Sequence, residues 1–262
     1  MGRQLASGTI EYDGFVIHFD PTEPGEAESL LTNGSYESDT VGAIKAILRD
    51  GSTFVDGGAH IGLLTCIAAR CVGRTGSVIA FEPAPRSRNL LEANVAANSF
   101  EARVTVVDAA ISDHVGSGEL MLVEGASQAN SLRQPGDDGA HRTVEIVSLD
   151  HYFESLGWPA VDLVKLDVEG QELRAILGMQ ELVRRNPQLQ LIFEYHQAQL
   201  QRSRTDPAEL FSALQQMGFD SFTSLFRQPK EFAVPADLAW LDQLASRANI
   251  NVLAARRRGV AI

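Results

Sequence analysis

Short apolar runs alternate with longer amphipathic segments along most of the chain after residue 50. Apolar runs rich in β-branched residues predict strands, whereas apolar positions three or four residues apart predict helices. This alternation is typical of a mostly parallel sheet with helices on both faces. We therefore expect an α/β fold with about seven strands, of which the last two form an antiparallel pair at one edge. The runs that predict strands cover residues 52–56, 76–83, 103–113, 161–170, 189–196, 220–226 and 249–256.

The segments between these runs carry helix signals. Residues 61–69 have apolar side chains at helical spacing. We predict one helix within residues 171–187, which ends before Pro187 because proline cannot continue a helix. A later helix begins at Asp206, whose side chain is expected to cap it, and ends before Gly218.

Two regions interrupt the alternation. Residues 1–50 contain a predicted hairpin, a polar stretch and a helix, and we expect them to form an N-terminal cap on the substrate side of the sheet. Residues 114–148 contain two alternating runs around a polar tip, which predicts an inserted β-hairpin whose tip lines the substrate. The chain is thus divided into a cap over residues 1–50 and a ligand-binding domain over residues 51–262 that carries the insertion.

Composition narrows the class of protein. The chain has 262 residues and a formal net charge of −12, which argues against a nucleic-acid binder because phosphates are neutralised by clustered Lys and Arg. No apolar run approaches the roughly 20 residues of a membrane span, and the first residues lack the apolar region of a secretory signal. Two cysteines, Cys66 and Cys71, are too few to specify a disulfide framework. We therefore expect a cytoplasmic protein without membrane or nucleic-acid partners.

The stretch "FVDGGAHIG", residues 54–62, joins an acid to three glycines. Glycine turns that receive pyrophosphate offer backbone N–H groups and a helix N-terminus, and an aspartate at their entrance would repel the phosphates. Asp56 therefore indicates a ligand with positive charge at this point. Glu82, about 20 residues beyond Gly62 at the end of the second predicted strand, is positioned to accept hydrogen bonds from ribose hydroxyls.

S-adenosylmethionine meets both requirements, since it has an adenosine, a sulfonium and an ammonium group but no phosphate. We infer that Asp56 holds the ammonium end directly or through water. Gly57, Gly58 and Gly62 would let the backbone pass beside the methionine portion. The same turn also fits the pattern G-x-A-x-x-G of dinucleotide-binding turns. An NAD-dependent oxidoreductase is therefore an alternative, which Asp56 disfavours. A non-catalytic S-adenosylmethionine sensor is a second alternative.

Acidic residues follow nearly every predicted parallel strand. At the end of the third strand, Asp108 or Ala109 is expected to meet the adenine edge, with a loop-capping role as the alternative for Asp108. Transfer to a hydroxyl requires acceptor oxygen, methyl carbon and sulfur in line and a base within hydrogen-bond reach. The candidate bases are Asp167, Glu169, Glu194 and His196.

Each candidate base has a rival interpretation. Lys165 shares the strand parity of Asp167 and Glu169, and we expect it to pair with one of them. Glu169 alternatively caps the next helix, and His196 alternatively has a structural hydrogen bond. Asp167, Glu169 and Glu194 offer oxygen ligands suited to Mg²⁺. A metal is possible but not favoured, because no dedicated ligand spacing is present.

Five motifs in this order resemble the FkbM family of S-adenosylmethionine-dependent methyltransferases: "FVDGGAHIG", "AFEP", "VDAAISD", "VDLVKLDVEGQE" and "IFEYH". The resemblance covers roughly residues 35 to 200. It implies a Rossmann-like class I methyltransferase fold, with S-adenosylmethionine as cofactor and S-adenosylhomocysteine as product. It also implies O-methylation of a sugar, polyketide or other small hydroxylated natural product, with N-methylation of a peptide or amine as the alternative.

The resemblance also bears on individual residues. His60 stands where the family usually has Asn, and we include it among the cofactor-binding candidates together with Asp167. Tyr36 and Glu37 match a Tyr-Glu pair often seen in the family ahead of the first motif. We expect these two residues on the substrate side of the site. The other substrate-side candidates are Gln128, Asn130, Ser131 and Glu194.

Overall fold

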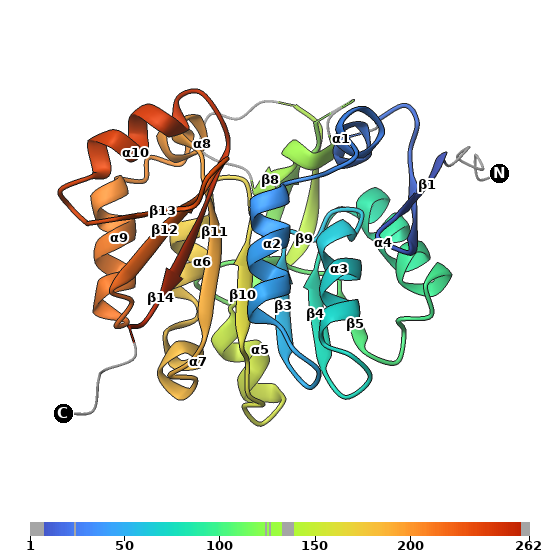
Figure 1. Ribbon diagram of the computed structural model, residues 1–262, viewed down its shortest axis with the longest axis horizontal. Coiled ribbons are helices and arrows are strands. Elements are labelled where there is room, and N and C mark those ends of the chain that lie inside the picture. Colours follow the sequence, from blue (N-terminus) through green and yellow to red (C-terminus); the bar gives the residue numbers. More distant parts are fainter. Residues whose placement is uncertain (1–7, 24, 124, 126, 133–138, 258–262) are drawn as a thin grey trace.

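An eight-stranded mixed sheet runs through the centre of the computed structural model (Figure 1). The structure describes residues 8–23, 25–123, 125, 127–132 and 139–257. From β5 to β11 the strands are parallel, whereas β14 is antiparallel to both of its neighbours and β13 is antiparallel to β12. This confirms the predicted mostly parallel α/β fold, to which a short edge strand is added. In spatial order the strands are β13 (Lys230–Phe232), β12 (Ser221–Leu225), β14 (Ile250–Ala255), β11 (Gln190–Tyr195), β10 (Leu163–Leu166), β3 (Thr53–Gly57), β4 (Ser77–Phe81) and β5 (Val104–Val107).

Both faces of this sheet are covered by helices, which is why its central strands are mostly apolar. Neighbouring strand residues face opposite cores, so that Phe54 packs with one helical layer and Val55 with the other. The first layer contains α2 (Ser38–Ile47), α3 (Leu63–Cys71) and α4 (Pro85–Ala97). The second layer contains α5 (Leu149–Ser155), α6 (Glu172–Leu177), α7 (Gln180–Arg185), α9 (Pro207–Gln216) and α10 (Leu238–Ala245). With both faces covered, the carboxyl ends of the strands are the place for a ligand, above all near the switch in strand order at β3 and β10.

The N-terminal segment forms a hairpin and two helices. Strands β1 (Gly8–Tyr12) and β2 (Phe15–Phe19) are joined by Asp13 and Gly14, which both have positive φ as a two-residue hairpin turn requires. The hairpin is attached to α4 by Asn94 and Asn98, whose side chains bond the backbone of β2.

The polar stretch after this hairpin contains helix α1 (Gly25–Asn33), which the sequence analysis did not predict. The helix buries only Ala27 and Leu30, too few apolar side chains to give a helical pattern.

A smaller four-stranded sheet lies beside the main one. It contains β6 (Ala110–Ile111), β9 (His141–Val147), β7 (Gly116–Met121) and β8 (Ser131–Leu132), with a 3-10 turn at Ser127–Ala129. The strand predicted over residues 103–113 is therefore wrong in extent, because the chain leaves β4 after Val107 and then pairs with β9. Residues 124, 126 and 133–138 of the expected tip lie outside the described residues.

The helix predicted over residues 171–187 is two helices, α6 and α7. At Gly178 a Cβ atom would lie 2.1 Å from the carbonyl oxygen of Ser112, so the chain passes too close to this neighbour for a side chain. The carboxylate of Asp150 accepts hydrogen bonds from the backbone N–H groups of Glu181 and Leu182 and so starts the second helix. In contrast, the cap predicted for α9 is confirmed, since Asp206 accepts from the N–H of Ala208. A further helix, α8 (Gln197–Arg202), follows β11.

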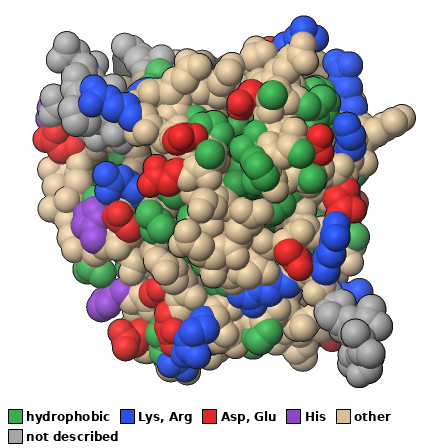
Figure 2. All heavy atoms as spheres, turned by 90° about the vertical axis from the view of Figure 1, so that its left-hand side faces the viewer, with side chains coloured by type: hydrophobic (Ala, Val, Ile, Leu, Met, Phe, Trp, Pro, Cys, Tyr) green, Lys and Arg blue, Asp and Glu red, His purple; other side chains and the backbone are tan. Residues whose placement is uncertain are grey.

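The edge strand β13 is protected by charge. Lys230 and Glu231 are exposed on it, and Glu231 pairs with Arg257. Figure 2 shows this end of the molecule, where charged side chains lie around a group of hydrophobic ones. Charged edges resist pairing with other chains. Within the described part of the chain, no helix has both the length and the apolar character needed to cross a bilayer.

Candidate functional site

A cavity opens at the carboxyl ends of β3, β4, β10 and β11. The N-terminal segment and the smaller sheet close its sides, because residues of both regions are among those that line it. Of the described residues that line the cavity, none is Lys or Arg. The lining includes five carboxylates: Glu37, Glu82, Asp167, Glu169 and Glu194. The cavity is therefore suited to a ligand that is neutral or positively charged.

The glycine turn after β3 is shaped by close packing. A Cβ atom at Gly58, which has a φ of +77°, would lie 1.8 Å from the carbonyl oxygen of Asp167, so only glycine fits beside that strand end. At Gly62 a Cβ atom would lie 2.3 Å from Leu91 on α4. Gly58 lines the cavity, whereas Gly57 and Gly62 are not among the lining residues. Close packing thus requires glycine at positions 58 and 62, and of the three glycines Gly58 also borders the cavity.

Glu82 joins the glycine turn to the end of β4. One carboxylate oxygen accepts a hydrogen bond from the backbone N–H of His60 at 2.8 Å, and the other accepts from Ala84 at 2.8 Å. The side chain is 6% exposed and lines the cavity. These two bonds fix the carboxylate in place at the edge of the cavity.

His60 connects the turn to the smaller sheet. It has a positive φ, and its Nε2 atom lies 3.1 Å from the hydroxyl of Ser127. Because both residues line the cavity, the histidine contributes a polar wall at a position where the resemblance led us to expect Asn.

Asp56 lies below the cavity instead of at its rim. It is 1% exposed, is not among the lining residues, and accepts a hydrogen bond from Thr65 at 2.6 Å. Its cross-strand neighbour is Lys165, a buried cation on β10. The direct contact that we expected between Asp56 and the ammonium group of a ligand is therefore not supported, because this carboxylate is buried beside the positive charge of Lys165.

Lys165 gathers several carboxylates around one buried ammonium group. Its Nζ atom donates a hydrogen bond to Asp167 at 2.8 Å, which confirms the pairing predicted from strand parity. Burial alone would lower the pKa of Lys165, but the charges of Asp167, Glu37 and Asp56 outweigh burial and hold this pKa above its ordinary value. The lysine is therefore charged at any physiological pH.

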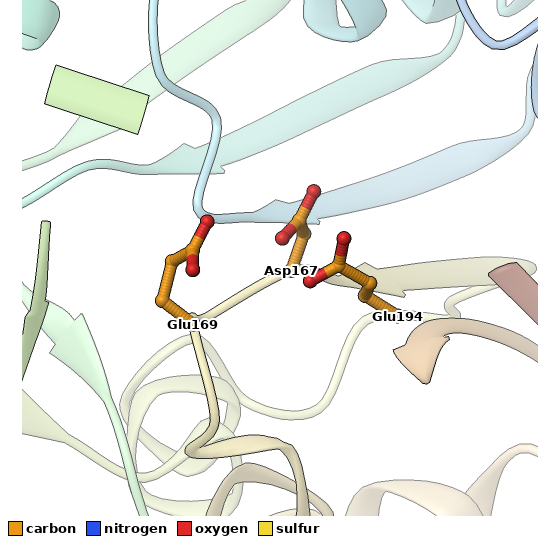
Figure 3. A group of neighbouring side chains, drawn as sticks. All are labelled: Asp167, Glu169 and Glu194. Atoms are coloured by element: carbon orange, nitrogen blue, oxygen red, sulfur yellow. The ribbon is translucent and has the colours of Figure 1, made fainter. Parts of the chain in front are cut away.

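Three carboxyl groups meet where β10 and β11 end (Figure 3). Asp167, Glu169 and Glu194 each place a carboxylate oxygen within 4.8 Å of the other two. Glu169 has a left-handed backbone with a φ of +56°, and its carboxylate accepts a hydrogen bond from Gln199. Burial, reinforced by the negative charge of Asp167, raises the pKa of Glu169 to about 8 and that of Glu194 well above its ordinary value. The group is thus one of mutually repelling acids.

The capping role considered for Glu169 is not seen, because the N-cap of α6 is Gln171 and no side-chain cap hydrogen bond is made there; the helix is instead joined to the loop before it by Glu172. Its Oε1 atom accepts hydrogen bonds from the backbone N–H groups of Val168 and Gly170. This leaves Glu169 turned into the cavity. Burial raises the pKa of Glu172 to about 7, although the two hydrogen bonds from the backbone act to lower it.

Glu172 should make stability depend on pH. A pKa that is higher in the folded than in the unfolded chain means that ionisation opposes folding, so its cost appears above the unfolded pKa of 4.5 and is complete above about 7. We expect the free energy of unfolding to fall as the pH rises through this window, with Glu172 contributing at most about 3 kcal/mol. In the variant Glu172→Gln, the free energy of unfolding should fall by up to about 3 kcal/mol less than in the wild type between pH 5 and 8, as measured by urea denaturation. Exposed Glu154, changed to Gln, is the control, and equal slopes for both variants would contradict this assignment.

Comparison with known families shows to which family the chain belongs. The family described as the methyltransferase FkbM domain matches residues 56–221. The chain belongs to this family. The FkbM resemblance seen in the sequence is thus confirmed, and the strand order is that of a Rossmann-like class I methyltransferase.

The FkbM domain is similar to several known proteins. Hexuronic acid methyltransferase AglP of Haloferax volcanii is 29% identical over 143 residues, which are 55% of this chain and 56% of AglP. The chain thus matches about half the length of this curated relative. A solved FkbM methyltransferase from Methylobacillus flagellatus has 18% identity and a TM-score of 0.41, with 56% of this chain and 33% of that chain covered. An O-methyltransferase from Thermotoga maritima has 15% identity and a TM-score of 0.48, with 96% and 78% covered.

Two further residues predicted to belong to the site do not line the cavity. Asp108 was expected near the adenine edge, but its side chain is 62% exposed and pairs with Arg88 on the surface. Its neighbour Ala109 lines the cavity. His196 is the first residue beyond β11, next to α8, and is not among the lining residues, so a direct catalytic role is not supported.

The substrate-side candidates whose side chains the structure describes border the same cavity. Tyr36, Glu37, Asn130 and Ser131 all line the cavity. The amide oxygen of Asn130 accepts from the backbone N–H of Val123, which ties the tip of the smaller sheet together. The side chain of Gln128 lies outside the described residues. The roles of these residues remain predictions.

Three polar residues that line the cavity were not predicted from the sequence: Ser127, Gln171 and Asn249. Gln171 stands within the motif "DVEGQE" and was within reach of the same reasoning as Glu169. Asn249 precedes β14, which enters the sheet beside β11. No motif marks Asn249, since only the strand order brings it to the cavity.

Proposed function

We propose that the protein is an S-adenosylmethionine-dependent methyltransferase that methylates a hydroxyl group of a sugar or a similar polyhydroxylated small molecule. The observation that carries this proposal is the charge of the cavity, with five carboxylates and, among the described lining residues, no Lys or Arg. The sulfonium and ammonium groups of S-adenosylmethionine suit such a cavity. The pyrophosphate of NAD would be repelled there, which disfavours the oxidoreductase alternative.

The residues of the glycine turn fit the cofactor. Glu82 is held rigid at the end of β4 and would accept hydrogen bonds from the ribose hydroxyls. Gly58 lets the backbone lie close beside the ligand, with Ala109 on the neighbouring strand end. Asp56 would act from below, by holding Lys165 in place. The cationic half of the cofactor would face the remaining carboxylates of the cavity.

When bound, S-adenosylmethionine supplies a methyl group already activated by the positive sulfur. We place the acceptor hydroxyl at Asp167, Glu169 and Glu194, which would hold it by hydrogen bonds. The bond from oxygen to methyl carbon forms while the carbon–sulfur bond breaks, its electron pair goes to sulfur, and the hydroxyl proton leaves to a carboxylate. The residues therefore contribute alignment and a proton acceptor.

A sugar is the acceptor class favoured by two observations. The cavity lining also includes Tyr36, Asn130 and Ser131, whose polar groups suit several hydroxyl groups. AglP, a relative over half its length, is named for hexuronic acid. The acidic wall of the present cavity favours an acceptor without a carboxylate of its own. It also suits an amino group, so an amino sugar methylated on nitrogen is the alternative acceptor.

Calorimetric titration tests the cofactor. We expect the protein to bind S-adenosylhomocysteine and not NAD. Glu82→Ala should weaken binding by more than about tenfold, because hydrogen bonds to a charged group are worth about 1.5–3 kcal/mol. Exposed Glu92, changed to Ala, is the control and should bind as the wild type does. Binding of NAD without binding of S-adenosylhomocysteine would contradict the methyltransferase proposal and favour the oxidoreductase alternative.

A further inference from the structure

We propose that Asp167, Glu169 and Glu194 bind one divalent cation that prefers oxygen ligands, with Mg²⁺ as the first choice. The ligands come from two strand ends, which explains why no metal-binding spacing is present in the sequence. Each side chain offers an oxygen within 4.8 Å of the other two, and the three carboxyl groups are turned toward a common space (Figure 3).

Glu194 provides an independent reason to expect a ligand. The residue is 5% exposed, it lines the cavity, and its Oε2 atom is buried without a hydrogen-bond partner among the described residues. A buried carboxylate oxygen without a partner loses the hydration that it has in the unfolded chain. Coordination of a cation at the space shared with Asp167 and Glu169 would restore this interaction.

The nearby positive charge is too small to balance these acids. Lys165 is bonded to Asp167 and also lies in the field of Asp56 and Glu37. The charge of Arg202 lowers the pKa of Glu169 less than that of Lys165 does, and Gln199, which bonds Glu169, is neutral. One divalent cation would balance the negative charge of the acids that Lys165 alone does not compensate.

The spacing suits a small hard cation. Around Mg²⁺ the metal–oxygen distances are about 2.1 Å, so neighbouring and opposite ligand oxygens lie about 3 to 4 Å apart. Movements of about 1 Å in the side chains would bring the three oxygens to that spacing. Three carboxylates leave coordination positions open for water or for ligand hydroxyls. The absence of Cys or His from this set disfavours Zn²⁺.

The part this cation would play in methyl transfer rests on the proposed function, whereas its binding does not. Two adjacent hydroxyls of a sugar could occupy the open positions. A hydroxyl bound to a divalent cation loses its proton more readily, so its oxygen would attack the methyl carbon as the proton passes to a free carboxylate oxygen or to water. This would select acceptors that carry neighbouring hydroxyl groups.

Mn²⁺ titration followed by electron paramagnetic resonance tests the site without any methyl transfer. After treatment with EDTA and its removal, we expect the full chain to bind one Mn²⁺, and Mg²⁺ to displace it. Glu194→Gln and Glu169→Gln should each weaken Mn²⁺ binding by at least about tenfold. Glu154→Gln, an identical change on the exposed surface of α5, should bind as the wild type does.

A folding control accompanies these variants. Because Glu194→Gln removes a charge from a repelling group, its melting temperature in EDTA should be no lower than that of the wild type. Absence of Mn²⁺ binding by the wild type, or equal binding by Glu194→Gln, would overturn the cation site. If the protein binds S-adenosylhomocysteine but no Mn²⁺, only the cation site fails. If it binds Mn²⁺ but no S-adenosylhomocysteine, the proposed function fails instead.

Discussion

Replacing Lys165 by methionine is expected to destabilise the fold by about 3–5 kcal/mol, the usual cost of removing one partner from a buried ion pair. The side chain is 3% exposed, and its ammonium group is bonded to Asp167 and lies in the field of Asp56 and Glu37. Methionine has similar length but leaves these carboxylates without the cation. Urea denaturation in EDTA at neutral pH measures the difference.

An exposed lysine of this chain supplies the matched control. Lys45 pairs with Asp13 at 2.7 Å, but the two side chains are 42% and 37% exposed. Lys45→Met should change the free energy of unfolding by less than about 1 kcal/mol, because surface ion pairs contribute little. In the double variant Lys165→Met, Asp56→Asn, part of the lost stability should return, since one uncompensated charge is removed. A loss below 1 kcal/mol in Lys165→Met would show that the lysine does not hold this site together.

The sequence was sufficient for features that depend on periodicity and strand parity. The parallel sheet, the cap at Asp206 and the pairing of Lys165 with Asp167 all follow from local spacing. The FkbM motifs predicted the family for the same reason, since the residues that identify it lie in short contiguous stretches at strand ends.

Features that depend on neighbours distant in the chain were missed. Asp56 seemed free to meet a ligand because the sequence did not reveal that Lys165 stands beside it in the sheet. Asp108 turns toward Arg88 on α4 instead of the cavity. A helix that looked continuous ends before Gly178, where Ser112 approaches closely, and Asp150 caps the helix that follows. The gathering of Glu169 and Glu194 also depends on the order of the strands, which local patterns do not encode.

Asp167→Asn is expected to lower turnover by about 10²- to 10⁴-fold, the range associated with loss of a positioned proton acceptor. The substitution keeps the shape of the side chain but removes the charge that would hold and deprotonate the acceptor. Affinity for S-adenosylhomocysteine should change much less, because Glu82 and the glycine turn would hold the adenosine half. Turnover measured by mass spectrometry with a panel of sugars, beside calorimetry on the same samples, separates the two effects.

Asp108→Asn makes this test specific. It is the same chemical change at the end of β5, but Asp108 is paired with Arg88 on the surface and is not among the cavity residues. We expect both turnover and S-adenosylhomocysteine affinity to stay within about threefold of the wild type, since surface ion pairs contribute little. Loss of affinity in Asp108→Asn would instead restore the adenine contact first inferred for this residue. Turnover of Asp167→Asn near the wild-type level would remove Asp167 from the reaction and leave Glu169 and Glu194 as the proton acceptors.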